Sequence, residues 1–74
     1  MSARVEVTSR MVLRALYEVA ERQGRAAVSV EDMAAYLKVD EKDVLRELLA
    51  LRTKRLATDK RRGGQRVWLP WRLA

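Results

Sequence analysis

The chain has 74 residues, of which 49% are hydrophobic and 35% charged, and 16 Lys and Arg against 10 Asp and Glu give a net charge of +6. This mix predicts one small globular domain, because a disordered chain carries fewer apolar residues. The sequence has no cysteine and no histidine, which excludes disulfides, thiolate zinc sites, thiol nucleophiles and histidine general bases.

Targeting and catalytic signals are not found either. No apolar run approaches the ~20 residues of a transmembrane helix, and no apolar signal-peptide core follows the Met1–Arg4 start. We therefore expect a cytoplasmic protein with no membrane partner. No metal-ligand spacing, phosphate loop or nucleophile motif is present, so we expect neither an enzyme nor a cofactor. Asparagine is absent and Arg outnumbers Lys 12 to 4, which fits a thermophile and equally a GC-rich genome.

The charge is unevenly distributed along the chain. Residues 1–30 carry a net charge of +2, residues 31–51 carry −3, and residues 52–74 carry +7. A nucleic acid would therefore be attracted mainly by the last third of the chain.

The first elements expected are an N-terminal arm over residues 1–8 and a helix from Ser9 to Gln23. Thr8 and Ser9 offer a hydroxyl that can cap the helix, and Gly24 suits the left-handed position that ends it. Ala26–Val28 is then a possible short strand.

Two further helices are expected after this strand. Ser29 caps a helix of about two turns that ends near Lys38–Val39. Asp40 can cap a third helix through the amide of Asp43, and this helix ends near Lys54.

From Leu56 the pattern changes from helical to alternating, which predicts a hairpin. Leu56–Thr58 and Arg66–Leu69 read as strands, and Gly63 and Gly64 mark the tip between them. Pro70 ends the last strand, leaving residues 70–74 as a tail. The domain proper is thus predicted over 9–69. Its expected core is Leu13, Leu16, Val19, Met33, Leu37, Val44, Leu48, Leu51, Val67 and Leu69, which would leave Trp68 on the outer face.

This order of elements, with Met33–Asp40 as second helix and turn, resembles the winged helix-turn-helix family, of a small, archaeal or thermophilic DNA-binding type. The resemblance extends from Leu13 to Leu69 and implies an α+β fold of three helices with a small C-terminal β-hairpin wing. The family usually has glycine where Lys38 and Arg55 stand here. It also implies that the third helix enters the major groove of DNA while the wing contacts the backbone or minor groove.

The outward face of the third helix supplies the first candidate nucleic-acid contacts, which are Lys42, Arg46 and Thr53. Carboxylates flank these cations and would be repelled by phosphate. Leu49 is apolar where a DNA-reading helix is usually polar, and Leu45 lies at the edge of the core stripe. Leu45 and Leu49 are therefore candidate protein-interface residues.

The hairpin supplies the stronger nucleic-acid candidates, Lys60, Arg61, Arg62 and Arg66. The alternative is that these cations are simply solvated. Trp68 and Trp71 either fold back over the small core or form a partner surface.

The function predicted from these features is binding of double-stranded DNA, mainly through the hairpin, by a transcription regulator or chromatin-associated factor. The alternative is a winged-helix module that binds protein in a replication, transcription or repair assembly, and an RNA-associated domain is a third possibility. A homodimer is also expected, because a 74-residue core is small.

Overall fold

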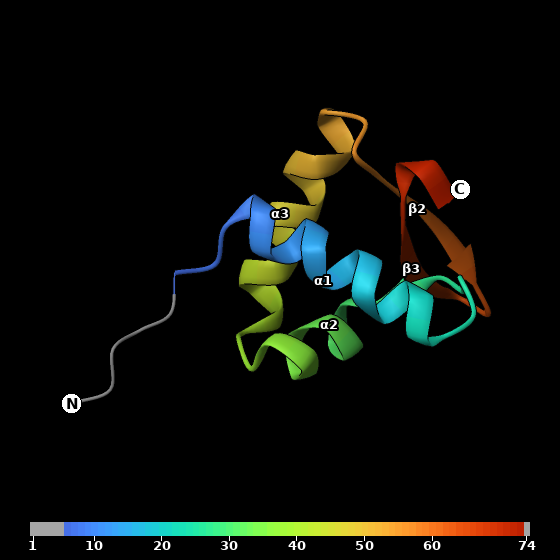
Figure 1. Ribbon diagram of the computed structural model, residues 1–74, viewed down its shortest axis with the longest axis horizontal. Coiled ribbons are helices and arrows are strands. Elements are labelled where there is room, and N and C mark those ends of the chain that lie inside the picture. Colours follow the sequence, from blue (N-terminus) through green and yellow to red (C-terminus); the bar gives the residue numbers. More distant parts are fainter. Residues whose placement is uncertain (1–5, 74) are drawn as a thin grey trace.

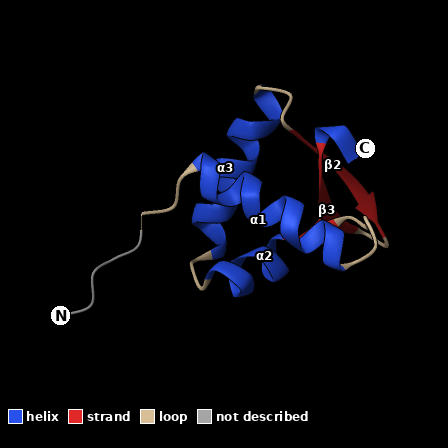
Figure 2. Cartoon of the chain, viewed as in Figure 1, coloured by secondary structure: helices blue, strands red, loops and turns tan. Residues whose placement is uncertain are grey.

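The computed structural model describes residues 6–73, which form three helices and a small sheet. In chain order the elements are α1 (Ser9–Arg22), β1 (Val28–Ser29), α2 (Val30–Leu37), α3 (Glu41–Thr53), β2 (Ala57–Arg62), β3 (Gln65–Pro70) and the short 3-10 helix η1 (Trp71–Leu73). The helices gather on one side of the molecule and β2 and β3 project from the other (Figures 1 and 2). The three α-helices, the short strand before α2 and the hairpin expected from the sequence are therefore present.

Each helix begins at a capping side chain that the sequence predicted. The Thr8 hydroxyl accepts a hydrogen bond from the Met11 amide, and the Ser29 hydroxyl accepts one from the Asp32 amide. The Asp40 carboxylate caps α3 but accepts from the amide of Lys42 at 2.9 Å, rather than from Asp43 as expected. These caps satisfy amides that have no partner in the first turn of a helix.

All three helices end with a left-handed residue, although only the first of these residues is glycine. Gly24, Lys38 and Arg55 have φ angles of 67°, 58° and 59°. In each case the next amide donates back to a carbonyl five residues earlier, as the Leu56 amide does to the Leu51 carbonyl at 2.9 Å, which is the Schellman arrangement. The positions where the family resemblance leads to glycine, Lys38 and Arg55, thus keep the conformation that glycine favours.

The sheet is antiparallel with the order β1-β3-β2, so β3 is the central strand. Arg62 pairs with Gln65, and the turn between them consists only of Gly63 and Gly64, whose φ angles of 57° and 81° are those of a tight hairpin. The segment 59–62, expected in the loop, therefore belongs to β2. The sequence did not predict a strand over 59–62 because all four side chains are polar, so apolar and polar residues do not alternate there.

The core contains Trp68, which is fully buried. This corrects the expectation that Trp68 would face outward. Trp68 belongs to the same buried cluster as residues of all three helices, whereas Val67 and Leu69, although buried as predicted, lie outside that cluster. Since successive strand residues point to opposite faces, the helices cover the Trp68 face of β3.

The packed unit is wider than residues 9–69. Val7, expected in a terminal arm, is buried in the core, and Leu73, expected in a tail, packs against it. Pro70 is the last residue of β3 and pairs with Ala57. The remainder of the predicted arm, residues 1–5, lies outside the described residues.

Residues 6–73 contain neither a membrane-spanning helix nor a cluster of metal-binding side chains. Among these residues, no helix is both long and apolar enough to cross a membrane. The same part of the chain holds no group of three or more acidic, histidine or cysteine side chains placed to bind a metal ion.

Candidate nucleic-acid interface

The outward face of α3 carries fewer available cations than its sequence indicates. Lys42 is exposed, and within residues 6–73 it makes no ion pair. Arg46, one turn further on, is held by two carboxylates of its own helix: Asp43 Oδ1 lies 3.3 Å from Nη1, and Glu47 Oε2 lies 3.1 Å from Nε. Glu47 raises the pKa of Arg46 through this hydrogen bond. The Arg46 charge is therefore largely offset on the helix itself.

Glu47 is in turn held by a residue from another helix. Ser9 Oγ, in the first turn of α1, donates a hydrogen bond of 2.7 Å to Glu47 Oε1. The Ser9 hydroxyl, followed by the Arg46 guanidinium, lowers the pKa of Glu47. The carboxylate thus stays ionised beside Arg46 and would repel phosphate there.

Thr53 lies at the C-terminal end of α3 and is exposed. Its hydroxyl donates a hydrogen bond of 3.1 Å to the carbonyl oxygen of Leu49. The hydroxyl proton is therefore engaged within the helix, and Thr53 can offer a ligand only its acceptor lone pairs.

The hairpin cations are divided between the two faces of the sheet. Arg61 lies directly opposite Arg66 in the β2–β3 register, on the face that also carries Trp68. Lys60 and Arg62 alternate with Arg61 and point to the other face. Lys60, Arg61 and Arg62 are exposed and make no ion pair within the described chain. The hairpin thus presents cations on both sides of its tip.

Asp59 is the residue that links the hairpin to α3, a contact that the sequence pattern did not predict. Its Oδ2 lies 3.1 Å from Arg52 Nη1 in the last turn of α3 and 3.3 Å from Arg66 Nε. The Arg66 guanidinium also lies over the Trp68 ring, 5.9 Å from its centroid. The available signal was that Asp59 is the sole acid among residues 52–74. One carboxylate is therefore shared by two arginines, and a third arginine, Arg61, lies opposite one of them, Arg66.

The apolar candidates for a protein interface differ in how deeply they are buried. Leu45 and Leu49 are half-buried and pack against the core. Trp68 is inside the core and cannot form part of an exposed surface. Trp71 is 48% exposed, which leaves it accessible to a partner.

Comparison with known proteins identifies the architecture. No family model matches the chain, and no curated protein matches it. Among solved structures, the chain is similar to the apo-Zalpha of zebrafish PKZ, with a TM-score of 0.66, 19% sequence identity, and coverage of 84% of this chain and 94% of that one. The fold is a winged helix. In this winged helix the β2–β3 hairpin is the wing, and α2 and α3 form the helix-turn-helix.

Proposed function

We propose that this winged helix binds the phosphate backbone of duplex DNA, mainly through the hairpin. The observation that carries the proposal is the placement of Arg61 directly opposite Arg66. Like charges at opposite strand positions destabilise a hairpin, and Asp59 is already shared between Arg66 and Arg52. A phosphate bound at this pair would supply the missing negative charge and accept several guanidinium hydrogen bonds.

Helix α3 contributes little affinity in this proposal. Arg46 is offset by Asp43 and Glu47, and Lys42 is its exposed, unpaired cation within the described residues. Base contacts specify sequence, whereas phosphate contacts only position the protein. We therefore propose a binder of modest sequence preference that acts as a chromatin-associated factor or transcription regulator in the nucleoid.

The test is a salt titration of binding, followed by fluorescence anisotropy on labelled duplex DNA of random sequence. Arg61→Ala/Arg62→Ala should weaken binding to all duplexes and reduce the slope of log K against log salt by up to about two, because each lost phosphate contact reduces it by about one. The matched control is Arg10→Gln/Arg14→Gln, which removes the same charge from α1. The proposal fails if the hairpin variant binds like the parent, or if both double variants weaken binding equally.

A second pair of measurements separates the alternatives for the ligand. Lys42→Ala/Arg46→Ala should reduce overall affinity less than the hairpin variant and should change any preference among sequences more. Duplex RNA and single strands are titrated in parallel. Tighter binding to either of them than to duplex DNA would reassign the nucleic acid, and no binding to any of the three at physiological salt would remove the nucleic-acid function.

A further inference from the structure

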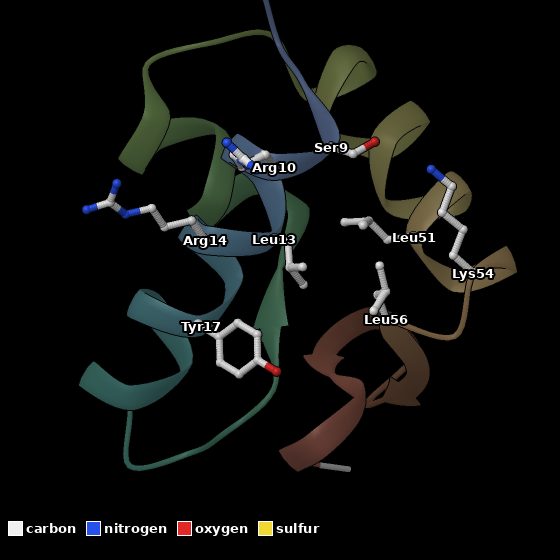
Figure 3. A pocket seen from close by; sticks show the side chains of 8 residues that line it. All are labelled: Ser9, Arg10, Leu13, Arg14, Tyr17, Leu51, Lys54 and Leu56. Carbon is white, nitrogen blue, oxygen red and sulfur yellow. The ribbon is translucent and has the colours of Figure 1, made fainter.

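An apolar groove lies between α1 and the C-terminal end of α3 with the loop that leads into β2, on a part of the surface that the proposed DNA interface does not use. It has a volume of about 390 Å³ and is open to solvent along one side. Leu13, Leu51 and Leu56 face one another across it, with Tyr17 at one end (Figure 3). Leu51 is buried and forms the floor, whereas Leu56 remains 43% exposed.

Trp71 follows β3 and is joined through its backbone to Leu56, one of the residues that line the groove. The Trp71 amide donates a hydrogen bond of 3.1 Å to the Leu56 carbonyl, so the two residues are neighbours. They are also the two large apolar side chains that remain exposed within residues 6–73. Single exposed apolar residues are ordinary, but a contiguous apolar surface with polar residues around it is typical of an interaction site.

The rim of the groove is basic. Arg10 lines it on the α1 side and Lys54 lines it on the α3 side, while Arg14 also borders it but extends its guanidinium away from Leu51 and Leu56 (Figure 3). Arg10 and Lys54 make no ion pair within residues 6–73. Arg14 does pair with Glu18 at 3.0 Å, but the Arg14 side chain is 82% exposed and Glu18 is shared with the Tyr36 hydroxyl.

The spacing on α1 indicates what kind of segment fits. Leu13 and Tyr17 are four residues apart, as are Arg10 and Arg14, so an apolar row and a basic row run side by side along the helix. The complementary surface is an amphipathic helix with one apolar row and one acidic row, which is a common mode of peptide recognition. A second copy of this chain fits less well, because the same basic rim would meet itself across a two-fold axis.

We propose that this groove binds an acidic amphipathic helix of a partner protein. The apolar row of the partner would lie on Leu13, Tyr17 and Leu56, and its carboxylates would contact Arg10, Arg14 and Lys54. The groove and the hairpin are separate surfaces, so the winged helix would hold DNA with one and a protein with the other.

The test uses two labelled synthetic helical peptides of about 18 residues. Each has a row of Leu residues, spaced four positions apart, along one face. One carries Glu beside the Leu row and the other carries Lys, and binding is followed by anisotropy. The Glu peptide should bind at least about tenfold more tightly than the Lys peptide, and its binding should weaken with salt.

Three variants of the full chain locate the binding. Leu56→Glu, at a position that is 43% exposed, should reduce affinity for the Glu peptide at least about tenfold. Arg10→Gln/Arg14→Gln should weaken its binding and flatten the salt dependence. Arg61→Ala/Arg62→Ala should leave it unchanged, while reducing DNA binding if the proposed function holds.

Three outcomes would overturn the proposal. One is that the protein binds the two peptides equally tightly, or binds neither of them. Another is parent-like binding of the Glu peptide by the Leu56→Glu variant. The third outcome concerns the oligomeric state, measured by sedimentation. If the parent is a dimer and the Leu56→Glu variant is a monomer, the groove binds a second copy of the chain. The expected homodimer would then be formed through this face.

Discussion

The hydroxyl of Ser9 lies 2.7 Å from Oε1 of Glu47 and joins two helices through residues that are 38 positions apart in the chain. Ser9 is in the first turn of α1 and Glu47 is in the middle of α3. The same carboxylate binds Arg46 through its other oxygen. The bond therefore links α1 to α3, and the carboxylate that accepts it also offsets the charge of Arg46 on the outward face of α3.

Replacement of Ser9 by Ala should lower the free energy of unfolding by about 1–2 kcal/mol at pH 7, because a hydrogen bond to an ionised acceptor is lost. The pKa of Glu47 is lowered in the folded chain, so its contribution is present above the ordinary pKa of about 4.5 and is lost as the pH falls through the folded value. The difference between variant and parent should therefore shrink below pH 4. Urea unfolding of the parent and the variant, at pH 7 and below pH 4, measures this difference in the free energy of unfolding. Thr53→Ala, which removes a hydroxyl bonded only within α3, is the control and should show no such pH dependence.

Replacement of Asp59 by Asn should strengthen DNA binding. The substitution removes the carboxylate shared by Arg52 and Arg66, so two cations and one unit of net charge become available to phosphate. The salt slope should become steeper by up to about two, while stability should change by less than about 1 kcal/mol, since the ion pairs are partly exposed. Glu21→Gln, which frees Arg25 at the end of α1, changes the net charge equally. An equal gain in both variants would show that only net charge matters.

The two tryptophans should be distinguishable in solution. Trp68 is fully buried and Trp71 is 48% exposed. The Trp71→Phe variant should therefore emit at shorter wavelength and resist quenching by acrylamide, whereas Trp68→Phe should leave a signal that is readily quenched. Equal quenching of both variants would contradict the placement of Trp68 in the core.

Leu48 and Leu49 are neighbours on α3 with different surroundings. Leu48 is fully buried, whereas Leu49 is half-buried at the edge of the core. Leu48→Ala should cost ~2–5 kcal/mol, a large share of the stability of a domain of this size. Leu49→Ala should cost less, because the site is open to water and leaves no closed cavity. Chemical denaturation of the two variants gives the comparison, and equal losses would argue against this orientation of α3.

The sequence alone determined where the helices begin and where the hairpin turns. Thr8, Ser29 and Asp40 cap amides two or three positions away, and Gly63 and Gly64 are adjacent in the turn they form. Interactions of this range depend on local residue types, so they can be read from the pattern. The left-handed Lys38 and Arg55 could be located only through the family resemblance, since neither residue favours that conformation.

Tertiary structure alone decided which surfaces face inward and which charges are available. Val67, Trp68 and Leu69 are all apolar and all buried, so alternation could not say which face of β3 meets the helices; the central position of β3 and the packing of α1–α3 against one face decide it. The sharing of Asp59 between Arg52 and Arg66 and the groove beside Leu56 depend in the same way on elements that come together only in the fold. The reason is that side-chain contacts between distant segments depend on packing geometry, which local periodicity does not encode.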